Sequence, residues 1–220
     1  MSISYKLNLP PHHHPGKLVV FDGVDGAGKT TLLEHAKASL TRRGITFAQT
    51  RMPSDRIRTM KEFRTFHDSH DAQKRTAISA FAITVLVHGD RLIVHESDVL
   101  PALRKGLWVL SDRYAFTSIA ICDDPIIRSI VERFVRPDFV FLADAPAEIV
   151  EQRVKSRPAE KELFYDTAEV RRRIETYRGL ARDNGFHVVN TNNSREGMLA
   201  DVDQVMTDLI ARWSGAPALA

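Results

Sequence analysis

The 220-residue sequence predicts an α/β protein with a five-stranded parallel sheet and helices on both of its faces. Five short apolar runs alternate with longer stretches whose apolar residues recur at helical spacing, which is typical of a parallel sheet buried between two helical layers. The hydrophobic and charged contents, 43% and 27%, are ordinary for a globular protein. In such folds, ligands bind at the carboxyl ends of the strands, where the strand order reverses.

The first expected strand is the apolar run at 17–23, which ends in glycine. The helix after it, at 29–43, carries a stripe of leucine and alanine and is closed by Gly44. Helical spacing returns from about 72 to 105, with an expected break at Pro101. The remaining strands are expected at 45–49, 107–110, 139–143 and 187–190, and the remaining helices at 125–135, 146–156, 167–184 and 195–213.

We expect a single domain over residues 17–213, because no repeat or linker divides the chain. Residues 1–16 are rich in Pro and His and lack periodicity, so we expect a flexible N-terminal tail there and a frayed C-terminal tail at 214–220. The adjacent histidines at 12–14 could bind a metal ion, but a solvated extension is the preferred interpretation.

Charge, hydropathy and cysteine content indicate which ligands and which compartment to expect. The formal net charge of +3 suits an anionic small ligand and is too small to imply nucleic acid. No apolar run is long enough for a membrane span, and no charged start followed by an apolar stretch is seen, so we expect no signal peptide. The one cysteine, Cys122, excludes an internal disulfide, which fits a reducing compartment. We therefore expect a cytoplasmic protein with small-molecule ligands and with no nucleic-acid or membrane partner.

A glycine-rich loop, G-V-D-G-A-G-K-T at 23–30, separates the first strand from the first helix. It fits G-x-x-x-x-G-K-[ST], in which backbone N–H groups and the positive end of the helix surround phosphate oxygens. Lys29 is expected to reach the outer phosphates, and the Thr30 hydroxyl to bind Mg²⁺. The alternative is a glycine-rich turn without a ligand. The residues expected to bind a nucleoside triphosphate are Gly23, Asp25, Gly26, Ala27, Gly28, Lys29, Thr30 and Thr31.

The loop alone does not separate GTPases, ATPases and small kinases. The N-K-x-D stretch of guanine-reading GTPases is missing after the last strand, where the sequence reads N-T-N-N-S-R. A large ATPase would be longer and would carry a strand that ends in consecutive acidic residues. A small kinase fits the length best.

Further motifs, in order along the chain, resemble those of the thymidylate kinases. In this chain, F-D-G-V-D-G-A-G-K-T-T (21–31) is similar to the opening of that family, and T-R-M-P (50–53) is similar to the family's T-R-E-P. G-D-R (89–91) is similar to the family's helical Asp-Arg, and S-D-R-Y (111–114) to its [SE]-D-R-[YF]. Its later motifs resemble F-L-A-D-A-P-A-E-I-V-E-Q-R-V (141–154) and V-R-R-R-I-E-T-Y-R-G-L-A (170–181). The resemblance covers about residues 17–211, and the ordered set is more specific than the loop.

The resemblance implies a three-layer P-loop kinase fold with a small lid at about residues 155–166. The implied reaction is transfer of the γ-phosphate of ATP, bound with Mg²⁺, to a nucleoside monophosphate, with thymidylate as the default acceptor. Thymidylate kinases are commonly homodimers packed through helices, so a homodimer is implied as well.

The acceptor phosphate requires cations, because phosphoryl transfer depends on alignment and charge neutralisation. Arg51, Arg91 and Arg113 stand at strand ends or on a helix near the loop, and guanidinium groups hold phosphates bidentately, so we expect them to clamp the acceptor. Surface ion pairs are the alternative. The resemblance adds Tyr114 and Ser118 to this site.

Two carboxylates are expected at the reacting centre. By resemblance, Asp25 positions the acceptor or a catalytic cation, and Asp112 helps to hold Mg²⁺ or its waters, together with Thr30. Asp112 could instead pair with Arg113 or cap the next turn. In relatives with glycine at the position of Gly26, the lid supplies the catalytic arginine. The expected catalytic residues are therefore Asp25, Lys29, Arg113, Arg153 and Arg157.

The segments expected to read the acceptor depart from the family. Where thymidylate kinases have G-G-T after T-R-E-P, this chain has Ser-Asp-Arg at 54–56. A Phe that stacks on thymine aligns with Val87 or His88, and a Tyr and a Gln that help to recognise the base or sugar become Ile121 and Cys122. We infer that the donor site is kept and the acceptor pocket is rebuilt.

Several alternatives stay open. A related kinase could act on a modified nucleotide or another phosphorylated small molecule, which the lost base-reading residues favour. A nucleotide-binding protein without turnover fits poorly with the retained Asp25, Lys29 and Asp112. A polynucleotide end kinase would need an aromatic and basic stripe, which the sequence lacks. No activating base marks Cys122 as a nucleophile, so packing is its preferred role.

Overall fold

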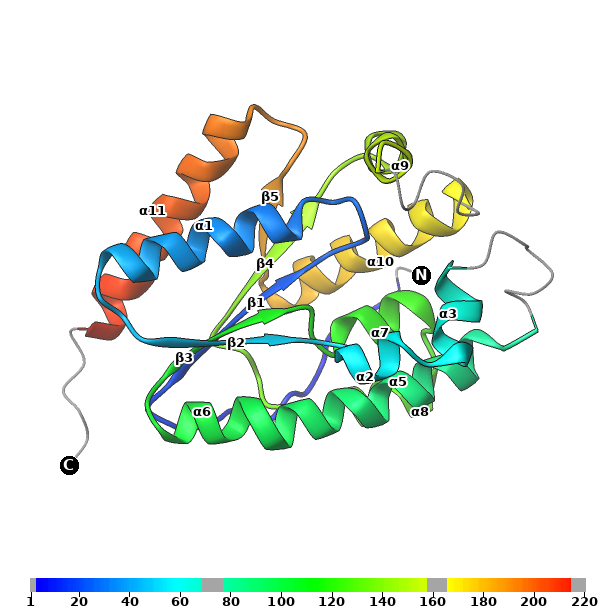
Figure 1. The fold of residues 1–220 in the computed structure, drawn as a ribbon, viewed down its shortest axis with the longest axis horizontal. Helices are drawn as coiled ribbons and strands as arrows, with labels where there is room; N and C mark the ends of the chain where they lie inside the picture. Colours follow the sequence, from blue (N-terminus) through cyan, green and yellow to red (C-terminus); the bar gives the residue numbers. More distant parts are fainter. Residues whose placement is uncertain (1–2, 69–76, 158–165, 215–220) are drawn as a thin grey trace.

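The computed structural model describes residues 3–68, 77–157 and 166–214. Five parallel strands form one sheet in the order β2-β3-β1-β4-β5, which confirms the predicted α/β class (Figure 1). The strands are β1 (Lys17–Asp22), β2 (Phe47–Arg51), β3 (Trp108–Asp112), β4 (Phe139–Asp144) and β5 (His187–Asn190).

The central strand β1 is buried on both faces of the sheet. Its residues 18–21 are all apolar and fully buried, because a parallel strand at the centre of a sheet meets helices on each side. It pairs with β3 on one side and β4 on the other, and the register places Phe21 beside Asp112. In β2, Arg51 also lies opposite Asp112. Charged residues therefore gather at one edge of the sheet, where β1, β2 and β3 end.

Helices α1 (Lys29–Arg42) and α11 (Arg195–Ser214) pack together over one face, above the sheet in Figure 1. The other face carries α5 (Ala80–Val94), η1 (His95–Val99), α6 (Leu100–Arg104), α7 (Phe116–Ile121) and α8 (Pro125–Val131), and α10 (Thr167–Asn184) packs against α7. Near the carboxyl edge lie α2 (Asp55–Arg58), α3 (Lys61–Asp68) and α9 (Ala147–Lys155). Within the described residues, no helix is long and apolar enough to cross a membrane.

The expected break at Pro101 is wrong. The chain is helical without interruption from residue 80 to 104, and the missing N–H of the proline is accommodated by one wide turn, η1, directly before it. The start of α5 is fixed by Ser79, whose hydroxyl accepts a hydrogen bond from the N–H of Ala82. The helices α2, α3 and α7 were not predicted, since each is short, with at most eight residues.

A flexible tail was expected over residues 1–16. Residues 4–16 instead pack along the domain. Leu7 and Leu9 are each 7% exposed. The N–H of Tyr5 donates to Asp183 at 2.6 Å, and its ring covers Gly179, where an added Cβ would lie 2.3 Å from Tyr5 Cδ2. His12 Nε2 lies 2.8 Å from an oxygen of Asp138, so it anchors the segment. The apolar residues that precede the prolines and histidines provide this packing.

The lid expected at about 155–166 falls largely at 158–165, which are outside the described residues.

Candidate active site

The glycine-rich loop joins the end of β1 to the start of α1. Gly23, Gly26 and Gly28 all have positive φ angles, of 136°, 82° and 100°. At Gly26 an added Cβ would lie 2.9 Å from both the carbonyl oxygen of Val150 and Cγ2 of Val154 on α9. A side chain there would push α9 away from the loop, so glycine permits both the turn and the close packing. The N–H of Gly23 donates to Asp22 and that of Ala27 to the carbonyl oxygen of Val24 at 3.2 Å, and the other N–H groups of the loop and the start of α1 are suited to binding an anion.

Lys29 is folded into this loop. Its amine donates to the carbonyl oxygen of Val24 at 2.8 Å and lies 4.0 Å from an oxygen of Asp25. Burial, together with the positive charge of Arg113, lowers the pKa of Lys29 to about 8, although the nearby carboxylates oppose this shift. The amine is thus held inside the loop at the place where phosphate oxygens would bind.

Asp22, the last residue of β1, organises the site and was missed by the sequence analysis. Its carboxylate accepts hydrogen bonds from the N–H of Gly23 at 2.9 Å, the N–H of Tyr114 at 3.2 Å, the hydroxyl of Thr117 at 3.0 Å and the phenol of Tyr177 at 2.7 Å. Burial and this carboxylate raise the pKa of the Tyr177 phenol, so it stays protonated and donates. A carboxylate directly before the loop was the available signal, but its partners on α7 and α10 are far away in sequence.

Arg113 follows β3 and crosses to the loop. Its φ angle of 69° is a left-handed conformation that few residues other than glycine adopt. In this conformation its guanidinium donates to the carbonyl oxygen of Gly23 at 2.7 Å and to Asp25 at 2.5 Å. The Arg113 charge holds the pKa of Asp25 well below its usual range. Burial alone would lower the pKa of Arg113, but Asp25 and the neighbouring carboxylate of Asp22 raise it above its ordinary value.

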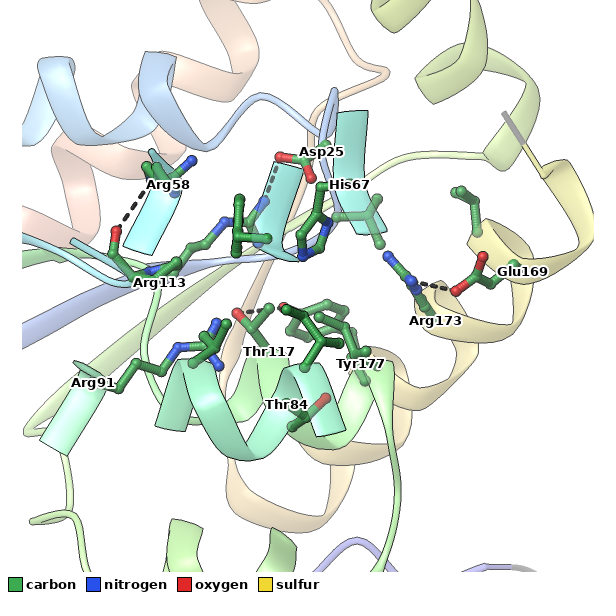
Figure 2. Close-up of a pocket in the computed structure, with 18 of the residues that line it drawn as sticks. Asp25, Arg58, His67, Thr84, Arg91, Arg113, Thr117, Glu169, Arg173 and Tyr177 are labelled. Carbon is green, nitrogen blue, oxygen red and sulfur yellow. Dashed lines mark hydrogen bonds and ion pairs between the residues drawn. The ribbon is translucent and has the colours of Figure 1, made fainter. Parts of the chain in front are cut away.

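A cavity of about 270 Å³ opens beside the loop, between α3, α5, α7 and α10. Figure 2 shows four arginine side chains from separate elements around it: Arg58, Arg91, Arg113 and Arg173. The guanidinium of Arg91 donates to Ser118 and is almost fully buried, which lowers its pKa to about 10. On α10, Arg173 is paired with Glu169. Such a concentration of guanidinium groups suits a phosphorylated ligand.

Arg58 was not predicted, although the structure explains its position. Asp90 on α5 accepts hydrogen bonds from the N–H of Ser54 at 2.7 Å and from its hydroxyl at 2.5 Å. This fixes the loop from which α2 begins, and Nε of Arg58 then donates to the carbonyl oxygen of Pro53 at 3.1 Å. The Ser-Asp-Arg stretch that replaces the family's G-G-T therefore begins the helix that carries this arginine into the cavity.

The other end of the cavity is apolar. It is lined by Phe63, Ile83, Val87, Ala120 and Ile121, and the ring of His67, which also lines the cavity, lies 4.2 Å from that of Phe63. Of the two residues that could align with the stacking Phe, Val87 faces the cavity. His88 instead lies 6.0 Å from the ring of Phe134, and burial lowers its pKa to about 3.

Three residues expected at the acceptor do not line the cavity. The phenol of Tyr114 is buried and donates to the carbonyl oxygen of Val135 at 2.9 Å, on the core side. Ser118 is also buried, and its hydroxyl accepts from Arg91, so it positions that guanidinium. Arg51 is 52% exposed, and its Nε lies 3.6 Å from Asp112. Cys122 is half-buried outside the lining, and burial raises the pKa of its thiol, which fits a packing role.

The two candidate lid arginines occupy different positions. Arg153, near the end of α9, donates to the carbonyl oxygen of Thr191 at 2.7 Å and to that of Gly26 at 3.4 Å, so it ties α9 and the segment after β5 to the loop. Arg157 is exposed at the end of the described segment. Their catalytic roles stay predictions.

The two residues expected at Mg²⁺ lie on either side of the loop. Thr30 is exposed in the first turn of α1, and Asp112 ends β3 with its side chain 18% exposed. Across the described ranges, no group of three or more His, Cys, Asp or Glu residues could hold a metal ion. Mg²⁺ in phosphoryl-transfer sites is held by one or two carboxylates together with phosphates and water, so a hydroxyl and one carboxylate fit such an ion.

The lowered pKa of Lys29 gives a prediction for polyphosphate binding. Above about pH 8 part of the amine population is neutral, and the charge of bound ATP favours the protonated form. ATP affinity is therefore expected to fall as pH rises through and beyond about 8, with uptake of a proton on binding. Calorimetric titrations at pH 8.5 in two buffers of different ionisation enthalpy measure this uptake. Lys29→Met removes the group, and equal uptake in the variant and the unmodified protein would contradict the assignment.

Comparison with known proteins agrees with the geometry of the site. The family model described as thymidylate kinase matches residues 21–202. The thymidylate kinase of Carboxydothermus hydrogenoformans is 29% identical over 85% of this chain and 95% of its own length, and that of Chromohalobacter salexigens is 26% identical over 91% and 99%. The thymidylate kinase of Leptospira borgpetersenii is 32% identical over 72% of this chain and 78% of its own. The chain belongs to the thymidylate kinase family.

Proposed function

We propose that this protein transfers the γ-phosphate of ATP to the phosphate of a nucleoside monophosphate, with thymidylate as the first acceptor to consider. The observation that carries the proposal is the position of the cavity. Its arginine-rich end adjoins the phosphate-binding loop through Arg113 and Asp25, which would bring a second phosphorylated ligand next to a bound triphosphate. Members of this family are nucleoside monophosphate kinases, and the match covers most of the chain.

Each part of the loop has a role in this reaction. ATP bound there supplies the transferable phosphate, with Lys29 and the loop N–H groups on its phosphates. Mg²⁺ would be held by Thr30 and Asp112. Arg113 couples the two ligand sites, because it contacts the loop and lines the cavity. We propose Arg153 and Arg157 as the sources of further positive charge at the transferring group.

One observation favours a different acceptor. The cavity walls that would face a base are Val87 and Ile121, where the family stacks an aromatic ring and uses polar side chains. A modified nucleotide or another phosphorylated small molecule is therefore the second candidate. A binding protein without turnover is less consistent with the retained loop and its paired Asp25 and Arg113.

A coupled ADP-release assay with a panel of deoxynucleoside and nucleoside monophosphates tests the proposal. Turnover with dTMP at rates usual for kinases, about 1–100 per second, supports the first acceptor. Turnover with another nucleotide in preference to dTMP supports the second candidate. ATP binding without acceptor-dependent ADP from any nucleotide would overturn the proposed kinase activity on nucleotides.

Arg58 gives a prediction for the acceptor phosphate. Arg58→Gln is expected to raise KM for the acceptor by about tenfold to a hundredfold, because a hydrogen bond to a charged group is lost, while KM for ATP changes little. Steady-state kinetics with each substrate varied measures both values. Arg56→Gln, on the exposed side of the same short helix, is the matched control. Equal effects of the two variants would remove Arg58 from the acceptor site.

We also propose a homodimer that forms through α5. The helix exposes Phe81, Val85 and Ile93, which are 38%, 40% and 46% exposed, and Gly89 lies between them on the same face at four-residue spacing. Val85→Glu is expected to convert a dimer into a monomer in size-exclusion chromatography with light scattering. Ile126→Glu on α8, at a position that is 55% exposed, should leave the dimer intact. A monomeric unmodified protein would contradict the proposal.

A further inference from the structure

Three consecutive arginines lie in the first half of α10, and they point in different directions. The side chain of Arg171 is 60% exposed and pairs with a glutamate of α9 at 2.6 Å. Arg172 is exposed and donates to the carbonyl oxygen of Ile121 at 3.2 Å. Arg173 instead lines the cavity. The proposed reaction has so far given Arg173 no role of its own.

Arg173 lies away from the phosphate-binding side of the cavity. One helical turn further along α10, a rise of about 6 Å, the phenol of Tyr177 donates to Asp22 beside the loop at 2.7 Å. Figure 2 shows Arg173, next to its partner glutamate, on the opposite side of the cavity from Arg58 and Arg91. A ligand that fills the cavity with its phosphate on the loop side therefore presents its other end to Arg173.

The guanidinium of Arg173 is oriented by one partner, and that partner uses few of its donors. Glu169, one turn earlier on the same helix, pairs with it, and the Arg173 side chain is 15% exposed. A guanidinium carries five N–H donors, and within the described residues Glu169 is the one group to which Arg173 donates. N–H donors on a largely buried charged group favour further acceptors, and a ligand in the cavity is placed to supply one.

The charges around Arg173 favour an uncharged partner over a second anion. Glu169 and Asp166 line the cavity from the same part of the chain, and the carboxylate of Asp166 accepts from the N–H of Glu169 at 3.0 Å. Two carboxylates thus accompany one guanidinium at this end, whereas three arginines outnumber Asp25 on the loop side. A phosphate is therefore favoured on the loop side, and a neutral hydrogen-bond acceptor beside Arg173.

We propose that Arg173 donates to a carbonyl oxygen on the base of the acceptor nucleotide and so selects bases with an oxo group over bases with an amine. The proposal rests on the proposed nucleoside monophosphate kinase activity. Thymine, uracil and guanine present a carbonyl oxygen at the edge where cytosine and adenine present an amine. A guanidinium has donors and no acceptor, so an amine placed against it loses its hydrogen bond to water and gains none. This free-energy cost acts together with exclusion by the apolar walls.

The ADP-release assay with nucleoside monophosphates measures this preference. For the unmodified protein, kcat/KM is expected to be higher for dTMP and dUMP than for dCMP, and higher for dGMP than for dAMP. Arg173→Met retains a long side chain without donors and should reduce the preference about tenfold to a hundredfold, with KM for ATP unchanged. Arg171→Met, at the exposed position two residues earlier, is the matched control and should retain the preference.

Thermal denaturation supplies a second measurement that does not depend on turnover. Without ligand, Arg173→Met should melt close to the unmodified protein, because one ion pair at helical spacing contributes little to stability. The rise in melting temperature caused by a saturating oxo nucleotide should be smaller in the variant, and the rise caused by an amino nucleotide should not be smaller. A purely structural role for Arg173 would lower the ligand-free melting temperature and leave the two rises in the same ratio.

Three outcomes would overturn the inference while the unmodified enzyme turns over nucleotides. These are an unchanged base preference in Arg173→Met, an equal loss of preference in Arg171→Met, and a preference of the unmodified protein for amino bases, which would assign the contact to the carboxylate of Glu169. Absence of turnover with every nucleotide in the unmodified protein would instead overturn the proposed function, and this inference with it.

Discussion

The site depends on one buried carboxylate. Asp22 is 1% exposed, and a charge removed from water in this way is stable only when hydrogen bonds replace the lost hydration. Four donors do so, from the phosphate-binding loop, the segment after β3, α7 and α10, and NH1 of Arg113 lies 3.7 Å away. Because each donor belongs to a different segment, the carboxylate fixes their relative positions at the carboxyl edge of the sheet.

The arginines around the cavity show the same dependence on supporting groups. Arg91 is held by Ser118, Arg58 by the carbonyl oxygen of Pro53, and Arg113 by Gly23 and Asp25. Guanidinium groups that are already oriented do not have to reorganise when a charged ligand arrives, which is the condition under which fixed charges stabilise a transition state most. The guanidinium groups at the cationic end of the cavity are therefore oriented by protein groups, and the loop beside it shares one of these arginines, Arg113.

The sequence was sufficient for the strands, the loop and most long helices, because these depend on local patterns such as apolar runs, glycine spacing and helical stripes. It was insufficient for contacts between distant residues. Tyr177 and Asp22 are 155 positions apart, and no short motif contains both. Backbone geometry explains why Tyr114 does not line the cavity as expected. The left-handed conformation of Arg113 directs the Arg113 side chain to the loop, and the side chain of Tyr114 then packs in the core. Arg58 was missed because Asp90, which fixes its helix through Ser54, is far away in sequence.

The apolar end of the cavity implies a particular kind of selectivity. A pocket that reads a base through several polar side chains can reward the correct base at many atoms. In this cavity, Val87 and Ile121 form the walls instead. A polar edge of a base placed against them loses its hydrogen bonds to water and gains none, so most discrimination between bases would come from this free-energy cost. For an acceptor bound as proposed, binding strength would come mainly from the phosphate, through the arginines, and the choice of base mainly from exclusion. An acceptor pocket built this way can change its preferred base through few substitutions, while the loop and the arginines that perform the transfer stay the same.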